Sequence, residues 1–266
     1  MAANTKRVLA VGAHPDDVEI MCSGTLFLLK PLGYEIHVAS LTLGDCGSNE
    51  HSAEAISRMR HEEAQAACTV LGAVYHCAGF SDLNIFNDDT GNRRVTALLR
   101  NVDPSIVFAH SSEDYISDHE TASLLVRNAC FYASVPNYKT RNLTPAGHSA
   151  AVPYLYYAQP MENTDIFGKR ITPQFYVDIG DFMRHKIEML SCHESQRKWL
   201  LEHHGMDEYV ESVRCGNASL AERASQVSET AINFAEGFRQ HLGHAYPPDN
   251  ILAMLLLDKV ILEPEY

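Results

Sequence analysis

The chain has 266 residues, of which 45% are hydrophobic and 21% charged, and a formal net charge of −13. This length allows one large core, so we expect a single domain over 1–266, with a tail at 247–266 whose role the sequence leaves undecided. Its negative charge would repel phosphate backbones, which argues against nucleic acid as a partner. The sequence has no apolar run long enough to cross a membrane and no secretory pattern, so we expect no membrane span. Its seven cysteines form no C-x-x-C pair, which is typical of reduced cysteines, and we therefore expect a cytoplasmic protein.

The first half of the chain alternates strand-like and helix-like segments. Strands are predicted over 7–12, 35–42, 73–77 and 105–109, and helices over 23–32, 53–71, 93–102 and 118–133. This order predicts a parallel sheet with right-handed crossovers, and therefore a Rossmann-like three-layer α/β/α fold with a mostly parallel sheet. In the second half we expect strands over 152–158 and 174–179, helices over 182–192 and 225–240, and an apolar segment over 251–262. That last segment is either a covering helix or an oligomer contact.

A histidine and three carboxylates follow the first predicted strand. The strand ends at Gly12, and the polar residues behind it are His14, Asp16, Asp17 and Glu19. Because side chains three residues apart share one side of a first helical turn, one metal ion could take both His14 and Asp17. Asp16 points elsewhere and is free to act on a metal-bound water. Glu19 is a candidate for orienting a ligand from behind.

The fourth predicted strand also runs into histidines and acids, over 110–120. Ligands bind at the carboxyl ends of the strands in open α/β sheets, where these two clusters would meet. A catalytic zinc takes about three protein ligands and keeps one position open, so we expect the third ligand from this segment. Each cluster alone would be interpreted as a helix cap. Their pairing at two strand ends favours a metal site.

Several segments resemble a known family. The sequences AHPDDVE at 13–19 and SGTL at 23–26 resemble the signature of the LmbE-like (PIG-L) zinc-dependent deacetylases, which remove N-acetyl groups from N-acetylglucosamine conjugates. The resemblance implies that His14, Asp17 and His119 bind zinc and that Asp16 is the general base activating a zinc-bound water. Such a ligand set would also admit Fe²⁺ or Co²⁺. Further matching segments lie at 41–48, 60–64, 71–73, 80–82, 114–119, 193–196 and 235–239.

One position departs from the family pattern. The family usually has His-Pro-Asp-His where this chain has ISDH at 116–119, and Ile116 can neither polarise a carbonyl nor protonate a leaving group. Either another residue substitutes, with His110, Tyr115 and His193 as candidates, or zinc alone suffices, or hydrolysis has been lost. We expect a zinc-dependent N-deacetylase of an N-acetylated sugar or sugar conjugate. The alternatives are a non-catalytic, metal-stabilised carbohydrate-binding or regulatory protein, and a hydrolase of a different amide.

The remaining candidates each have a functional and a structural interpretation. Arg60 either lies near the substrate or forms a helix-surface ion pair with Glu63. Asp82 either holds a sugar hydroxyl or shapes a turn, and His193 either lines the pocket mouth or caps a helix. Asp118 either caps its helix or supports a metal ligand from behind. The expected partner is a small amidated sugar or glycoconjugate, and the sequence leaves a homo-oligomer open.

Overall fold

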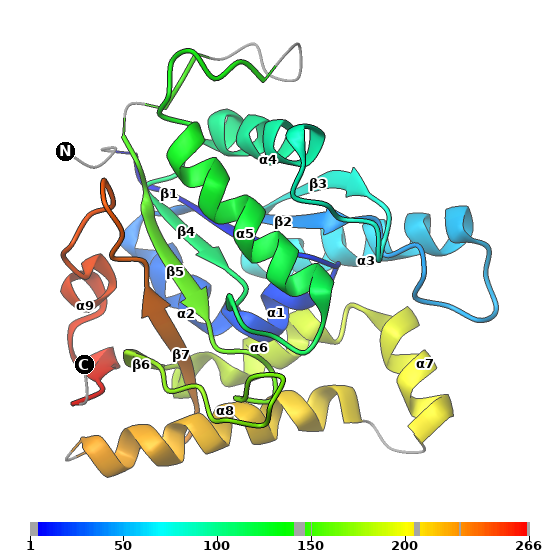
Figure 1. Cartoon of the computed structure of the whole chain (residues 1–266). Helices are drawn as coiled ribbons and strands as arrows, with labels where there is room; N and C mark the ends of the chain where they lie inside the picture. Colours follow the sequence, from blue (N-terminus) through cyan, green and yellow to red (C-terminus); the bar gives the residue numbers. More distant parts are fainter. Residues whose placement is uncertain (1–4, 141–146, 150, 205–207, 229, 265–266) are drawn as a thin grey trace.

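The computed structural model describes residues 5–140, 147–149, 151–204, 208–228 and 230–264. Its centre is an eight-stranded sheet in the order β3-β2-β1-β4-β5-β7-β6-β8, with helices on both faces (Figure 1). From β3 to β5 neighbouring strands run parallel, and the pairs that involve β7, β6 and β8 are antiparallel. The three-layer fold with a mostly parallel sheet is therefore confirmed. The strands are β1 (Arg7–Gly12), β2 (Glu35–Thr42), β3 (Val74–Phe80), β4 (Ile106–Ala109), β5 (Tyr154–Ala158), β6 (Phe175–Asp178), β7 (Ala235–Gln240) and β8 (Val260–Leu262).

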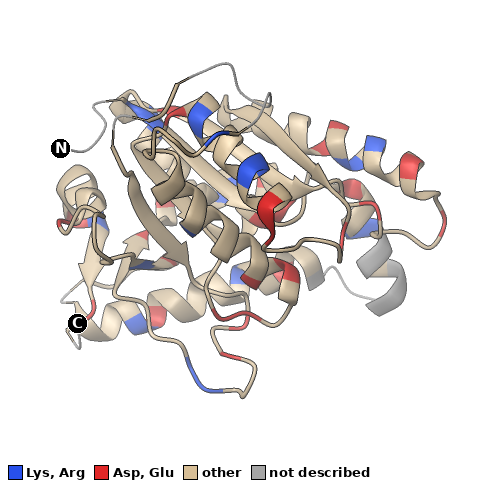
Figure 2. Cartoon of the chain, turned by 45° about the horizontal axis from the view of Figure 1, so that its top comes forward, with Lys and Arg blue, Asp and Glu red and all other residues tan. Residues whose placement is uncertain are grey.

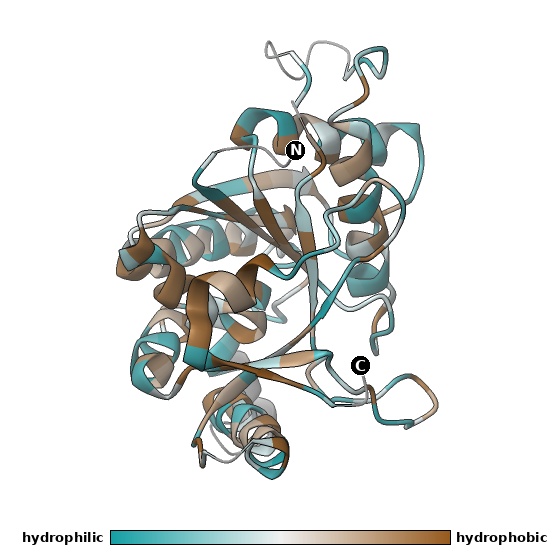
Figure 3. Cartoon of the chain, turned by 90° about the vertical axis from the view of Figure 1, so that its left-hand side faces the viewer, coloured by the Kyte–Doolittle hydropathy of each residue, from teal (hydrophilic) through white to brown (hydrophobic). Residues whose placement is uncertain are grey.

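Alternate residues of the central strand face the two helical layers. Val8 and Ala10 belong to the core under α2, α3 and α6, whereas Leu9 and Val11 belong to the core under α4 and α5. This alternation is the period-two geometry of a strand that is buried on both sides. Figure 3 shows the hydrophobic residues concentrated on the strands and on the helices that cover them. The helices are α1 (Asp17–Met21), α2 (Ser23–Leu29), α3 (Ala53–Leu71), α4 (Asp89–Val102), α5 (Ser117–Tyr132), α6 (Met183–Leu190), α7 (Glu194–His204), α8 (Glu208–Val227) and α9 (Ile251–Leu256).

Local signals account well for the first-half helices. The predicted helix over 53–71 is α3, which begins after Ser52, whose hydroxyl accepts the Ala55 N–H, and ends at Gly72 with φ 67°. A serine N-cap and a left-handed glycine are the usual helix ends. Helix α4 begins earlier than predicted, because Asp88 caps it by accepting the Gly91 N–H.

The second half contains the main corrections. The predicted helix over 225–240 is wrong: α8 ends at Val227, and residues 235–240 form β7 between β5 and β6. Burial on both sides of the sheet outweighs the weak helical pattern of this segment. Helices α7 and α8 were not predicted at all. The apolar segment 251–262 is not one covering helix, because it forms α9 and then β8, which pairs with β6 at the sheet edge.

Charged residues of both signs are interspersed along the ribbon (Figure 2). Among the described helices, none combines the length and the apolar character that crossing a bilayer would require.

Candidate metal centre and its cavity

A sharp backbone turn after β1 brings His14 and Asp17 together. A Cβ atom at Gly12 would lie 2.6 Å from the Asp17 Cβ, so only glycine allows this approach. Asp16 has a positive φ of 106°, a backbone conformation that costs conformational energy in a residue with a side chain. Backbone strain of this kind often occurs at functional sites. We expected His14 and Asp17 to share the first turn of a helix. The helix begins only at Asp17, however, so His14 lies before it. The two residues still meet, because the His14 N–H donates to Asp17 Oδ2 over 2.6 Å.

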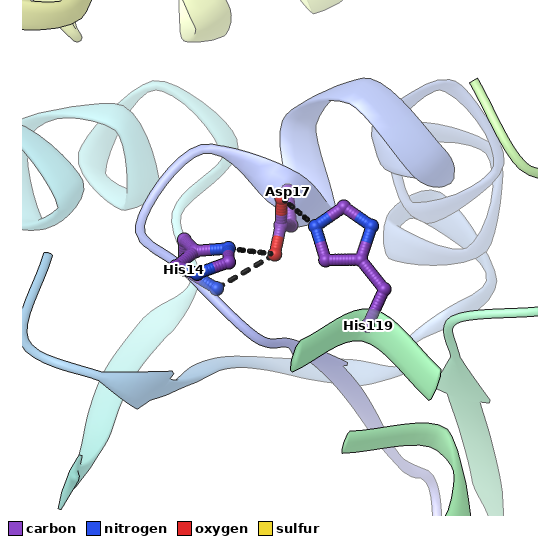
Figure 4. A group of neighbouring side chains, drawn as sticks. All are labelled: His14, Asp17 and His119. Carbon is purple, nitrogen blue, oxygen red and sulfur yellow. Dashed lines mark hydrogen bonds and ion pairs between the residues drawn. The ribbon is translucent and has the colours of Figure 1, made fainter. Parts of the chain in front are cut away.

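His119 completes a group of three potential ligands (Figure 4). It enters from α5, because β4, which precedes that helix, lies beside β1 in the sheet. Asp17 Oδ2 lies 3.5 Å from His14 Nδ1, Asp17 Oδ1 lies 3.4 Å from His119 Nε2, and the ligand atoms of the group all lie within 4.8 Å of one another. Zinc–nitrogen and zinc–oxygen bonds of about 2.0–2.1 Å place the ligands of a tetrahedral site about 3.4 Å apart. The donor set and its spacing therefore fit such an ion.

A carboxylate supports each histidine from behind. His14 Nε2 lies 3.2 Å from Asp118 Oδ2, and His119 Nδ1 lies 3.0 Å from Asp114 Oδ1. These contacts leave Nδ1 of His14 and Nε2 of His119 facing Asp17, an arrangement that orients metal-binding imidazoles in proteins. Asp118 is not the N-cap of α5, since that position is Ile116, whose side chain forms no cap.

Opposite charges hold this group together. Burial alone would raise the pKa of Asp17, but the charge of His119 and the contact with His110 hold it well below its usual range. Burial alone would lower the pKa of His14, but hydrogen bonds with Asp118 and Asp17 raise it to about 10. The pKa of His119 likewise rises to about 9 against the effect of burial, because Asp17 and Asp114 favour its charged form. A bound cation would displace these imidazole protons, since metal ligation requires neutral histidine.

His110 lies directly behind the metal group. Its ring stacks on His119 with centroids 3.9 Å apart, and its Nε2 lies 2.9 Å from Asp17 Oδ2. Burial, followed by the charge of His119, lowers the pKa of His110. The Ala13 nitrogen lies 3.0 Å from the same Nε2, so this ring nitrogen either donates to Asp17 or accepts the Ala13 N–H, depending on the tautomer. His110 is thus placed to position Asp17.

Asp16 has partners that differ from those of Asp17. The Tyr209 hydroxyl donates to Asp16 Oδ2 over 2.7 Å, and the Arg60 guanidinium lies 3.3 Å from the same oxygen. Burial raises the pKa of Asp16, although Arg60 acts in the opposite direction. Arg60 is only 3% exposed and also donates to the Pro15 carbonyl, so of its two interpretations the surface ion pair with Glu63 is not observed. Glu63 instead accepts hydrogen bonds from Ser195.

A cavity of about 350 Å³ opens over these residues. Its lining includes the four residues implied as ligands and base, together with Arg60, His110 and Tyr115. Tyr209 was not predicted from the sequence, although its helix carries a recognisable apolar spacing through Val213 and Leu220. The other lining residues that were not predicted are Ile20, Met21, Asp114, Gln159 and Met161.

Four sequence candidates do not line the cavity, and Asp118, which contacts His14, is one of them. Both Asp82 oxygens accept backbone N–H groups, from Gly44 and Cys46, so Asp82 braces the loop after β2. Its interpretation as a turn residue fits better than that of a sugar ligand. Glu19 and His193 are both buried, with Oε1 and Nε2 3.2 Å apart. Because Glu19 pairs with His193, it does not orient any of the three candidate metal ligands in the described structure.

The fold and the site together define an α/β protein with a candidate metal centre at the carboxyl ends of β1 and β4. Residues 9–130, which include His14, Asp16, Asp17 and His119, match the family profile "PIG-L: GlcNAc-PI de-N-acetylase". This part of the chain therefore resembles the PIG-L (LmbE-like) family, as its sequence motifs predicted.

Two curated relatives differ in the activity they are named for. The chain is 28% identical to a diacetylchitobiose deacetylase of Thermococcus kodakarensis over 202 residues, which are 73% of this chain and 71% of that protein. It is 27% identical to a 4-oxalmesaconate hydratase of Pseudomonas putida over 243 residues, 88% of each chain. The chain is therefore similar both to a protein named as a deacetylase and to a protein named as a hydratase.

Solved structures share the fold. An N,N'-diacetylchitobiose deacetylase from Pyrococcus horikoshii superposes with a TM-score of 0.74 at 22% identity, covering 92% of this chain and 88% of that one. The 4-carboxy-2-hydroxymuconate hydratase GalB from Pseudomonas putida superposes with a TM-score of 0.72 at 24% identity, covering 92% of this chain and 100% of that one. The fold is thus common to both kinds of enzyme.

Proposed function

We propose that this protein is a metal-dependent hydrolase that removes the acyl group from an N-acylated sugar or sugar conjugate. The observation that carries the proposal is the position of Asp16. It lies in the same cavity as three convergent metal donors, makes none of their mutual contacts, and is held by Tyr209 and Arg60. The deacetylase relative supports the amide class.

His14, Asp17 and His119 would hold the ion, with zinc as the expected metal. When bound there, zinc polarises a carbonyl and makes water more acidic. The Asp16 carboxylate accepts a proton from the attacking water and returns it to the leaving nitrogen. Tyr209 and Arg60 keep one Asp16 oxygen occupied, so the other carboxylate oxygen is available for this transfer.

Because position 116 is isoleucine and not histidine, we assign to Asp16 the return of the proton to the leaving nitrogen. Ile116 is not among the cavity-lining residues. His110 contacts Asp17 and Ala13, and His193 is buried against Glu19, so neither is free to protonate a leaving group. Tyr115 is 58% exposed at the cavity rim, where it can contact a substrate.

Turnover of N-acetylated sugars by metal-loaded protein tests this function. N-acetylglucosamine and N,N'-diacetylchitobiose are incubated with the enzyme, and released acetate and free amine are quantified. The Asp16→Asn variant should lose about 10²- to 10⁴-fold in kcat while keeping its metal content, since a general base contributes that much. Asp88→Asn is the matched control, because asparagine caps a helix as well as aspartate does. Equal rates for wild type and Asp16→Asn across the panel would refute the proposal.

Hydration of an unsaturated carboxylate is the second candidate, favoured by the hydratase that aligns with 88% of each chain. Asp16 could equally take a proton from a water that adds to a double bond. The cavity argues against a highly charged substrate, because its only described lining cation of fixed charge, Arg60, is already paired with Asp16. Loss of ultraviolet absorbance from 4-oxalmesaconate, without any acetate release from the sugars, would favour the hydratase.

A further inference from the structure

We propose that the cavity continues into an apolar crevice beside α8 that receives the acyl chain of the substrate, so that acyl groups longer than acetyl are preferred. This inference rests on the proposed function and adds a substrate class to it. The crevice has a volume of about 40 Å³ and shares Ile20, Met21, Gln159 and Met161 with the larger cavity. The two spaces therefore lie side by side.

The crevice begins next to the reacting groups. Ile20 and Met21 follow Asp16 and Asp17 by one helical turn, and the Ile20 N–H donates to the Asp16 carbonyl over 3.2 Å. Side chains four residues apart in a helix share one face. A group attached to the reacting carbonyl would thus meet an apolar wall first.

Helix α8 and the loop between β5 and β6 form the other walls, and Figure 1 shows this loop passing over α8. Val213, Gly216 and Leu220 come from the helix, and Met161 comes from the loop. Methionine adapts to chains of different shape because its side chain is flexible.

Four of the five polar side chains that line the crevice form hydrogen bonds within the protein, and the fifth, Asn163, is partly exposed. Asn217 Nδ2 donates to the Ala235 carbonyl over 2.7 Å, and Glu236 Oε1 lies 2.6 Å from Lys186 Nζ. The side-chain oxygens of Gln159 and Asn217 have no described hydrogen-bond partner, but they have almost no accessible surface either. An occupant would therefore contact mainly apolar atoms.

The polar part of the cavity comes from different elements. Arg60 belongs to α3 and Gln196 to α7, which Figure 1 places on the right, away from the middle of α8. Both residues line the cavity but not the crevice. Such a division suits a substrate with a polar sugar on one side of its amide and an apolar acyl chain on the other.

The volume limits the length of the chain. One water needs about 10–15 Å³ measured in this way, so the crevice accommodates roughly three carbon atoms beyond an acetyl group. Burial of a methylene is worth about fourfold in binding or in kcat/KM. We expect N-butanoylglucosamine to exceed N-acetylglucosamine about tenfold in kcat/KM.

Gly216 provides a direct test by steric block. A Cβ atom there would have a single neighbour within 4 Å, the Met161 carbonyl oxygen at 4.0 Å, so a larger side chain extends into the crevice without a backbone clash. Gly216→Leu should reduce the butanoyl-to-acetyl ratio of kcat/KM to about one. Ser219→Leu, which adds the same side chain to an exposed position of α8, should keep the wild-type ratio.

Binding provides a second readout that needs no turnover. Dissociation constants of the N-acetyl and N-butanoyl sugars are measured by calorimetry on the Asp16→Asn protein, with and without Gly216→Leu. Tighter binding of the butanoyl sugar that Gly216→Leu removes would support the crevice even if neither sugar is hydrolysed, a result that would reject the proposed function alone. Equal binding of both sugars, or an equal loss of both in Gly216→Leu, would overturn the crevice proposal.

Discussion

Asp16 is the residue on which the site depends most. It adopts a left-handed conformation that most residues with side chains avoid, and a tyrosine and an arginine from distant helices hold its carboxylate. Strain of this kind costs about 1–3 kcal/mol and persists only where the surroundings enforce it. The neighbouring Asp17 has entirely different partners, and the pKa values of these two adjacent carboxylates are shifted in opposite directions, upward for Asp16 and downward for Asp17.

Removal of the Tyr209 hydroxyl should slow turnover without removing metal. Tyr209→Phe deletes the hydrogen bond to Asp16, and we expect kcat to fall about tenfold, the equivalent of about 1.4 kcal/mol. KM and the metal content should stay unchanged, because Tyr209 contacts none of the three metal donors in the described structure. Tyr154→Phe is the matched control, since it also removes a tyrosine–aspartate hydrogen bond, with Asp249. Wild-type kcat in Tyr209→Phe would contradict the role assigned to this hydroxyl.

Loss of the support behind His14 should weaken metal binding. Asp118→Ala removes the carboxylate that orients the imidazole, and we expect about 10- to 100-fold lower zinc affinity in a competition assay with a chelator. Because Asp118 also accepts the Leu83 N–H, circular dichroism should check that the fold is intact. An unchanged zinc affinity would show that His14 needs no such support.

Among the structural elements, β7 connects the two halves of the molecule. Its Glu236 is 1% exposed, pairs with Lys186 of α6, and accepts the N–H groups of Gly24 and Thr25 at the start of α2. One buried carboxylate thus connects β7, α6 and α2. Because the Glu236 carboxylate is buried, its hydrogen-bond partners must compensate for the water that it has lost.

Breaking this buried pair from one side should be costly. Lys186→Met leaves the Glu236 charge without its cation, and we expect the free energy of unfolding to fall by about 3–5 kcal/mol. The double variant Lys186→Met/Glu236→Gln should be less destabilised than Lys186→Met alone, because no buried charge remains. Urea denaturation of the four proteins in the cycle measures the coupling. Additive losses would mean that the two side chains act independently.

On the scale of the whole molecule, the parallel half of the sheet holds the metal donors and the antiparallel half closes the cavity. Beyond β8, Glu263 accepts hydrogen bonds from Tyr176 of β6 and Arg223 of α8, at 2.8 Å each. Burial would raise the pKa of Glu263, but the hydrogen bonds from Arg223 and Tyr176 lower it below its usual value. This contact joins the sheet edge to the helix that contributes Tyr209.

The Glu263 cluster should make stability depend on pH. A pKa that is lower in the folded protein stabilises the fold above the unfolded value of about 4.3, and this stabilisation is lost as the pH falls through the folded value. Glu263→Gln should therefore lower the free energy of unfolding by about 1–2 kcal/mol at pH 7. The difference from wild type should shrink below about pH 4. A difference in thermal midpoint that stays constant from pH 7 to pH 3.5 would contradict this linkage.

Local sequence order was enough for the first half of the fold and for part of the site. Strands followed by histidine and acids predicted that His14 and Asp17 would meet a ligand from the segment 110–120, and the family resemblance implied that this ligand is His119. The donor atoms of the three residues do converge. Carboxyl ends of adjacent parallel strands share one edge, so strand order accounts for the meeting of the two segments and the resemblance accounts for the choice of His119. The error over 225–240 arose because β7 is defined by its neighbours in the sheet and not by its own pattern.

From the sequence alone, periodicity and the order of the parallel strands predicted the three-layer fold and the meeting of two polar segments at one sheet edge, and the family resemblance implied the metal ligands and the general base. Only the tertiary structure decided which side chains surround Asp16, since Arg60 and Tyr209 reach it from α3 and α8. It also separated Asp118, which contacts His14, from Glu19, which contacts His193. Such contacts depend on how helices distant in the chain pack against one another, and residue spacing carries no information about that packing.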